Sequence, residues 1–306
     1  MDLNAILGIE MPHPALLWAG VLEGTVQAAV LALTALGLSL VFGVMRVVNV
    51  AHGEFFMMGA VIAWFSADLT AGLVGGPAWL GFLVALLVAP VLVGAIAAVV
   101  DMFVLRRLEH DPEATIVATI GFLYIIQQLA LTVYGPEARP VEAPFDWRIR
   151  LPWFGYSAYK FFVIGAAVVL MIGVWLVLTR TRIGLVMRAT QLDREMASAF
   201  GIPVARVYAG VFALGAGLAA MGAVLVVPVQ QAHYLMGGDP LLLSFIVVII
   251  GGLGSLKGTV VAAVLIGLSD GVISTLFDPT LAKILATLAV AMVLVFRPQG
   301  LFGVRA

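Results

Sequence analysis

The sequence contains no cysteine and little charge. Asp, Glu, Lys and Arg make up 11% of its 306 residues, whereas soluble domains carry roughly 25%. The missing cysteine excludes disulfides, thiol nucleophiles and thiolate metal sites. The net charge of −1, without a cluster of Lys or Arg, argues against a nucleic-acid partner. We expect no metal and no cofactor, because the four histidines lack the spacing of metal ligands: His13, His52, His110 and His233.

Hydrophobic residues, in contrast, make up 63% of the chain. A soluble protein exposing so much apolar surface would aggregate, so most of this surface is expected to face lipid. About 20 apolar helical residues cross a hydrocarbon core about 30 Å thick. The sequence therefore predicts an all-α polytopic membrane bundle, with eight or nine crossings in one domain, 1–306. The clear candidate spans are 78–104, 115–134, 161–178, 208–227 and 258–276. Less certain are 15–44, which is long enough for a tilted or broken helix, and the short stretches 55–69, 241–253 and 283–296.

The positive-inside rule predicts the orientation. If segment 180–207 is cytoplasmic, eleven basic residues face the cytoplasm and five face the outside. The N-terminus is then outside and the C-terminus inside, which favours nine crossings. The N-terminal residues also lack the basic region of a signal peptide, so no cleaved signal is expected. The inner set is Arg46, Arg106, Arg107, Arg180, Arg182, Arg188, Arg194, Arg206, Lys257, Arg297 and Arg305; the outer set is Arg139, Arg148, Arg150, Lys160 and Lys283.

The largest outside segment, 135–159, is rich in proline and aromatic residues. Proline at this density disfavours a helix, and the aromatic residues are typical of the membrane interface. We interpret the segment as a periplasmic loop that forms an interfacial lid, in preference to a substrate site.

The most informative segment is 180–207, RTRIGLVMRATQLDREMASAFGIPVARV, which holds seven charged residues, whereas 208–238 holds none. Leu192, Met196, Ala199 and Phe200 fall on one face of a helix, and Ile183, Val186, Met187 and Thr190 form a second stripe upstream. Gly201 is well placed to end a helix, and Pro203 blocks its continuation. Such an amphipathic segment either lies on the membrane surface or docks on a protein partner; its mixed charge favours the partner.

A second polar cluster follows the first predicted span. Asn49, His52 and Glu54 stand between apolar stretches, where ionisable residues indicate function, and Gly53 permits a helix break. The alternatives are a translocation path or a short cytoplasmic turn. A glycine-rich stretch that contains Gly251, Gly252 and Gly254 is similar in character and suggests a weak internal repeat. Asp270, inside the span 258–276, is a further candidate for lining a path.

The chain shows no means of hydrolysing ATP by itself. No segment outside the predicted spans exceeds about 30 residues, and a nucleotide-binding domain needs at least about 50. The stretch GGLGSLKGT at 251–259 lacks the glycine before its lysine that a phosphate-binding loop requires. An enzyme is therefore not expected, and ATP hydrolysis would belong to separate subunits.

Four motifs, in order along nearly the whole chain, carry a resemblance to a known family. They are GVMRVVNVAHGEFFMMGA at 43–60, RTRIGLVMRAT…ASAFGI within 180–202, VIIGGLGSLKG at 248–258, and RPQGLFG at 297–303. The sequence resembles the H-type permease subunit of branched-chain amino acid ABC importers, in the bacterial inner membrane. The wider family includes urea and short-amide permeases.

The resemblance implies a permease that pairs with a second, homologous permease. Two ATPase subunits would dock on the coupling segment 180–207, and a periplasmic binding protein would deliver the solute. It implies coupling residues Arg182, Gly184, Arg188, Ala189, Ala197, Gly201 and Ile202. The translocation path or helix break would comprise Asn49, His52, Gly53, Glu54, Gly251, Gly252 and Gly254. The alternatives are a urea or short-amide permease and a self-sufficient secondary transporter, for which Glu54 and Asp270 are the strong candidates within the spans.

Overall fold

The computed structural model describes residues 14–297 and 299–302 and is almost entirely helical. Residues 1–13, where no cleaved signal is predicted, and Arg305 lie outside this range. The helices are α2 (Pro14–Met45), α3 (His52–Val74), α4 (Ala78–Val100), the π-helix η1 (Asp101–Leu105), α5 (Pro112–Val133), α6 (Ala158–Arg180), α7 (Arg182–Leu192), α8 (Arg194–Ala199), α9 (Val204–Val226), α10 (Gly238–Gly251), α11 (Leu256–Leu276) and α12 (Pro279–Phe296). Two short strands, β1 (Arg148–Arg150) and β2 (Gly155–Ser157), form an antiparallel hairpin.

Eight of the described helices are long and apolar enough to cross a membrane. The predicted all-α polytopic bundle is therefore confirmed. The helices predicted at 55–69 and 283–296 begin earlier than expected, at His52 and Pro279. Both are therefore long enough to cross a membrane. Only α10 stays short: its 14 residues extend about 21 Å at 1.5 Å per residue, less than the hydrocarbon thickness of about 30 Å.

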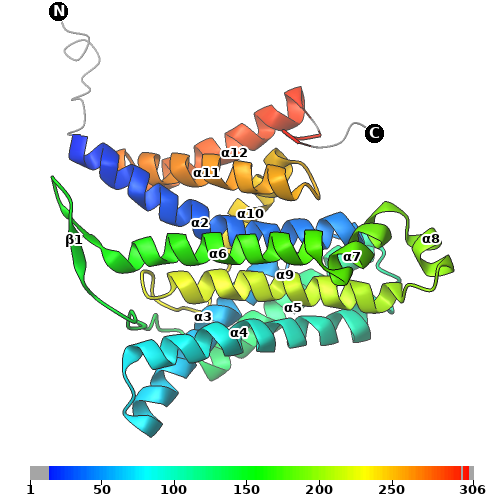
Figure 1. Cartoon of the computed structure of the whole chain (residues 1–306), viewed down its shortest axis with the longest axis horizontal. Coiled ribbons are helices and arrows are strands. Elements are labelled where there is room, and N and C mark those ends of the chain that lie inside the picture. The colour runs from blue at the N-terminus through cyan, green and yellow to red at the C-terminus, as the bar shows by residue number, and fades with distance from the viewer. Residues whose placement is uncertain (1–13, 298, 303–306) are drawn as a thin grey trace, which may run out of the picture.

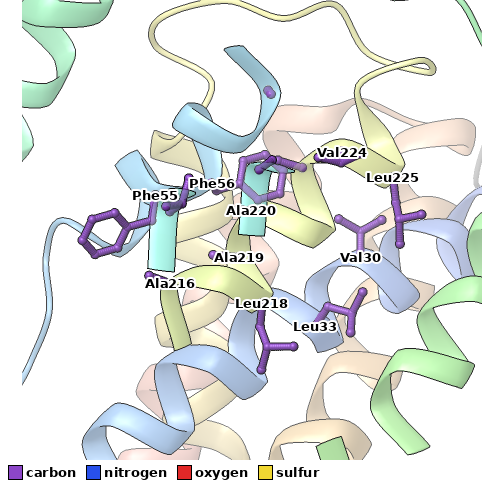
Figure 2. Close-up of a cluster of buried hydrophobic side chains, with 14 of the residues drawn as sticks. Val30, Leu33, Phe55, Phe56, Ala216, Leu218, Ala219, Ala220, Val224 and Leu225 are labelled. Atoms are coloured by element: carbon purple, nitrogen blue, oxygen red, sulfur yellow. The ribbon is translucent and has the colours of Figure 1, made fainter. Parts of the chain in front are cut away.

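The core lies where α2 and α9 cross. Figure 2 shows the small side chains of α9 between Val30 and Leu33 of α2 on one side and Phe55 of α3 on the other. The small residues Gly215, Ala219 and Ala223 of α9 are buried. A Cβ on Gly37 of α2 would lie 2.3 Å from the Gly215 carbonyl oxygen. The two helix backbones therefore touch, as small residues allow in membrane bundles.

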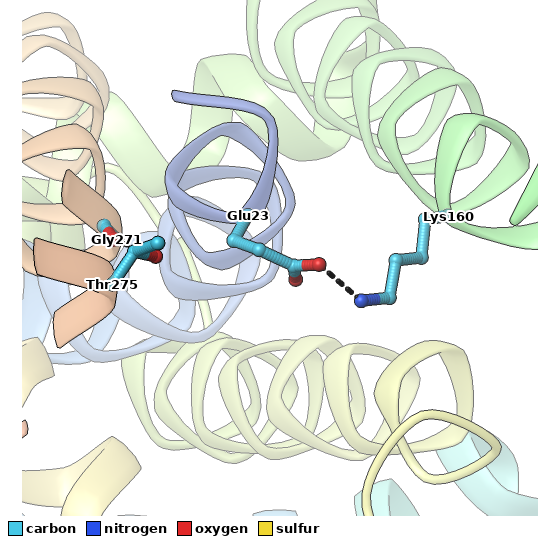
Figure 3. A network of polar contacts seen from close by, with 4 residues as sticks. All are labelled: Glu23, Lys160, Gly271 and Thr275. Carbon is cyan, nitrogen blue, oxygen red and sulfur yellow. Dashed lines mark hydrogen bonds and ion pairs between the residues drawn. The ribbon is translucent and has the colours of Figure 1, made fainter. Parts of the chain in front are cut away.

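The α2 helix also contacts α11 and α6 near the N-terminal end of α2. A Cβ on Gly271 would lie 2.2 Å from Gly24 Cα, and Thr275 donates to the Gly271 carbonyl at 2.7 Å. On another side of α2, Glu23 forms an ion pair with Lys160 of α6 (Figure 3). These contacts fix α2 between two helices that are distant in the sequence.

The segment 135–159 lies at one end of the bundle, with the β1–β2 hairpin, and α7 and α8 lie at the other end (Figure 1). It contains no helix before α6, as its prolines predict, but the short hairpin was not anticipated. Arg139 and Ala232 exchange backbone hydrogen bonds of 2.9 Å, and the Tyr134 hydroxyl donates to the Ala232 carbonyl at 2.7 Å. The segment is thus joined to the α9–α10 connection.

Replacing Gly215 by Leu should destabilise the bundle, because any side chain there meets the α2 backbone. We expect a loss of about 1–3 kcal/mol, measured as a lower midpoint of thermal unfolding in detergent. The matched control is Gly210→Leu in the same helix, where a Cβ has open space. Equal stability of the two variants would contradict the close α2–α9 contact.

Candidate functional site

The segment 180–207 begins with a sharp turn between α6 and α7. Thr181 adopts an extended conformation, and its hydroxyl accepts a hydrogen bond from the Gly184 N–H at 3.3 Å, which makes it the N-cap of α7. A Cβ on Gly184 would lie 2.1 Å from the Leu178 carbonyl oxygen. Glycine at this position therefore lets α7 fold back tightly against the end of α6.

The helix of this segment is broken at Asp193, which corrects the predicted stripe. Asp193 is extended (φ −152°), and its carboxylate accepts from the Met196 N–H at 2.9 Å, so it caps a new helix, α8. Leu192 therefore belongs to α7, whereas Met196 belongs to α8. The prediction of one continuous helix through these residues was wrong because aspartate stabilises a helix start better than a helix interior.

The predicted end of the second helix is confirmed. Gly201 has φ +82°, a conformation that favours glycine. The Ile202 N–H donates to the Ala197 carbonyl at 3.0 Å, and the Gly201 N–H to the Ser198 carbonyl at 2.9 Å. This is the Schellman arrangement that terminates many helices.

Large apolar side chains of this segment are exposed. Leu192, Met196 and Phe200 are 82%, 52% and 80% exposed, although they lie beside charged residues. We call these three residues the apolar ridge. Of the predicted coupling residues, Arg182 and Arg188 are also exposed, whereas Gly184 and Ala197 are buried and shape the segment from within. Ala189 and Ile202 are half-buried, and Gly201 is exposed at the turn.

Behind the segment lies a buried hydrogen-bonded pair of ionisable side chains that the sequence reasoning missed. His110 Nε2 lies 3.0 Å from Asp101 Oδ1, and both side chains are almost fully buried. The His110 ring contacts Tyr208 edge-on at 4.8 Å between centroids, and the Arg194 guanidinium lies 5.8 Å from the same Tyr208 ring. The only available signal was two ionisable residues next to an apolar stretch. This chain of contacts connects α8 with the π-helix η1.

The predicted helix break after the first span is a non-helical segment, residues 46–51, between α2 and α3. Its backbone amides find side-chain acceptors: Val50 N–H donates to Thr119 Oγ1 at 3.2 Å, and Ala51 N–H to Asn49 Oδ1 at 3.1 Å. Asn49 is 1% exposed. Its side chain therefore replaces the hydrogen bonds that a helix would have supplied.

His52 and Glu54, at the start of α3, are buried and hydrogen-bonded to different helices. His52 Nε2 lies 2.9 Å from the Thr34 carbonyl oxygen of α2. Glu54 Oε1 accepts from Gln127 Nε2 of α5 at 2.9 Å. Both residues are at most 1% exposed. A solvated turn beyond the helices would leave them exposed, whereas here both side chains are buried.

Helix α3 begins well inside the bundle. Thr34, beside His52, precedes the end of α2 at Met45 by about three helical turns, or about 16 Å. The start of α10 lies against the start of α3, because a Cβ on Gly53 would lie 2.3 Å from the Gly237 carbonyl oxygen. Two helices therefore start next to each other within the bundle.

The second glycine-rich stretch folds against the end of α2. Gly252 and Gly254 have positive φ angles of 102° and 79°. A Cβ on Gly254 would lie 2.9 Å from Gly43 Cα, and one on Gly251 would lie 2.5 Å from the Gly258 carbonyl carbon. The Leu301 N–H donates to the Ile250 carbonyl at 2.8 Å. The second glycine-rich stretch therefore packs on the end of α2, with the tail after α12 beside it.

The part of the chain that the structure describes has no group of three or more His, Asp or Glu side chains suited to a metal ion. The polar groups above instead hold backbone and helices in place. The arrangement consists of a projecting two-helix segment at one end and two internal helix starts.

Residues 20–296 match the family model of the branched-chain amino acid transport system permease component. The chain is 26% identical to the high-affinity branched-chain amino acid transport system permease protein BraD of Pseudomonas aeruginosa, over 92% of this chain and 94% of that protein. It is 24% identical to the LivH permease protein of Escherichia coli K12, over the same shares.

An archaeal relative, a probable LivH permease protein of Methanocaldococcus jannaschii, is 26% identical over 93% of this chain and 92% of that protein. No solved structure gives a significant match. The family match and the eight apolar helices describe a multi-pass protein of the bacterial inner membrane. Because the family model covers nearly the whole chain, the chain belongs to the family of permease components of branched-chain amino acid transport systems.

Proposed function

We propose that this chain is the permease subunit of an ATP-driven importer that translocates branched-chain amino acids across the inner membrane. The observation that carries the proposal is the apolar ridge on α7 and α8, on a chain whose family consists of transport permeases. Leu192, Met196 and Phe200 are exposed beside charged residues at one end of the bundle, an arrangement that suits a soluble partner. Amphipathic helices commonly dock in this way into a groove of a partner.

The partners follow from the same features. Two ATPase subunits bind the coupling segment 180–207 from the cytoplasm, and a second, homologous permease completes the path. A periplasmic binding protein delivers the amino acid at the opposite end, where the 135–159 segment lies. The N-terminus is outside and the C-terminus inside, as the distribution of Lys and Arg favours.

The translocation path in this proposal runs past the two internal helix starts. Irregular backbone inside a membrane is tolerated only where protein or water surrounds it, and broken helices mark the solute path in many transporters. His52, Gly53 and Glu54 at the start of α3, with Asn49 before it, hold one side of the break. The C-terminal end of α10 is formed and held by three glycines, Gly251, Gly252 and Gly254. Movement of α8 reaches the bundle through Arg194, Tyr208 and His110.

The direct test is purification of the tagged chain from its native membrane in mild detergent, with mass spectrometry of the accompanying proteins. We expect ATPase subunits and a second permease, and ATP-driven leucine uptake after reconstitution with the binding protein. A chain that is isolated alone and moves solute in proteoliposomes without ATP would instead be a secondary transporter. ATP-driven uptake of urea or short amides in place of leucine would identify the chain as a urea or short-amide permease instead.

Replacing Phe200 by Ser should uncouple the importer, because the apolar ridge loses its most protruding ring. We expect ATP-driven uptake to fall on the order of tenfold, the effect of an interface anchor worth at least ~1.4 kcal/mol. Membrane insertion should be unchanged, since the side chain is 80% exposed. The matched control is Phe277→Ser, which removes an exposed ring (69%) from the opposite end of the bundle. Equal uptake by both variants would exclude the docking role of Phe200.

Replacing His52 by Ala should lower uptake by roughly tenfold while the ATPase subunits still bind. The Thr34 carbonyl then loses its donor inside the bundle, a cost of about 1–3 kcal/mol. His52→Gln, which keeps an N–H donor, should recover most of the uptake. The measurements are leucine uptake and co-purification of the ATPase. If H52A fails to assemble, the role of His52 is structural only.

A further inference from the structure

A cavity of about 280 Å³ lies beside the two internal helix starts and is assigned to nothing above. Thr34 and Phe56 line it next to His52, and Gln230 and His233 line it in the α9–α10 connection. This connection is joined to Arg139 at the end of the bundle opposite α7 and α8 (Figure 1). Small-molecule sites have volumes of roughly 300–1,000 Å³, so the cavity accommodates a solute the size of a single amino acid.

The cavity contains three charged side chains but only one ion pair. Lys283 Nζ donates to Asp239 Oδ2 at 2.7 Å, and this pair is largely exposed. Asp270 is half-buried in α11 and has no ion pair or hydrogen bond to its side chain among the described residues. The Lys283 ammonium acts on the Asp270 carboxylate at a distance but forms its ion pair with Asp239, so Asp270 can still bind a cation directly. The natural complement is an ammonium group.

The cavity lining also contains groups that attract an anion. Gly238, Asp239 and Pro240 place the N-terminus of α10 on its wall, and the positive end of a helix dipole favours a carboxylate. Lys283 stands at the same wall. Because its present partner Asp239 is 65% exposed, a carboxylate entering from outside can replace Asp239 at little cost. Lys283 and the α10 N-terminus thus offer a carboxylate site in the same small cavity as Asp270.

Between the charged groups the wall is apolar. Val30 and Leu31 of α2, Phe56 of α3 and Leu243 of α10 all line the cavity and are at most 7% exposed. A branched aliphatic side chain would bury its surface against them, at about 25 cal/mol per Å² of apolar surface. The lining therefore presents a cation acceptor, an anion acceptor and an apolar face together.

From this combination we propose that the cavity is a transient binding site for the zwitterion of an aliphatic α-amino acid. Asp270 receives the ammonium group, Lys283 and the α10 N-terminus receive the carboxylate, and Val30, Leu31 and Phe56 contact the side chain. The proposal rests on the proposed function and adds a site within this subunit to it. Gln27 and Ser274, which also line the cavity, supply further hydrogen bonds.

The test is equilibrium binding of radiolabelled leucine to the full-length chain in lipid nanodiscs. The wild type should bind leucine, and Asp270→Asn should bind it at least about tenfold more weakly, the loss of one charge-assisted hydrogen bond. Asp270→Glu should retain most of the affinity. The matched control is Asp68→Asn, which removes the same charge from an exposed position that does not line the cavity. No leucine binding by the wild type, or equal binding by wild type and D270N, would overturn the proposal.

Competitors define the chemical class. 3-Methylbutylamine carries only the ammonium group and 4-methylpentanoate only the carboxylate, so each should compete at least about tenfold less well than leucine. A competitor as effective as leucine would show that one charge suffices and would overturn recognition of the zwitterion.

Uptake separates this proposal from the proposed function. ATP-driven leucine uptake into native membrane vesicles should occur with the wild type and show a raised KM with D270N. Absence of ATP-driven uptake by the wild type would reject the importer itself. Uptake with the same KM in wild type and D270N would reject only the cavity as a leucine site.

Discussion

The need to satisfy every backbone polar group away from water determines this structure more than any other constraint. Helices satisfy these backbone groups along most of the chain. The most important exception is the non-helical segment 46–51. Its free amides are taken up by Thr119 and by the side chain of Asn49. With these acceptors in place the chain can turn back into the bundle and start α3 beside Thr34. Without them the break would be too costly, and α2 and α3 would be joined only beyond the helix ends.

Close backbone contact is the second condition, and small residues provide it. Gly37 meets Gly215, and Gly53 meets Gly237, at distances that no Cβ would allow. The first contact places α2 against α9 in the core, and the second places the α10 start against the α3 start. Together they leave a small polar cavity between α2, α10 and α11, while the projecting α7–α8 segment remains free at the other end. Rigid packing thus joins the cavity to the projecting segment.

Much of this could be predicted from the sequence, because lipid imposes a simple pattern of long apolar helices. The charge contrast between 180–207 and 208–238 located the projecting segment, and Gly201 located its end. The contacts between helices, and the exact helix ends, were harder to predict from the sequence. The break at Asp193 depends on its capping bond to Met196, which competes closely with helix continuation. The Asp101–His110 pair left only a weak signal, two ionisable residues beside an apolar stretch. Gly53 and Gly237 are far apart in the sequence, and a single sequence carries no signal for their contact.

The central claim is that the cavity opens to the outside and the apolar ridge to the cytoplasm. Because the natural chain has no cysteine, single cysteines report this directly. Ser274→Cys lies in the cavity, and Ser198→Cys lies exposed on α8. In right-side-out membrane vesicles, a membrane-impermeant maleimide should label S274C at once and S198C only after permeabilisation. Labelling of S198C in sealed vesicles, or of S274C only after permeabilisation, would contradict the account.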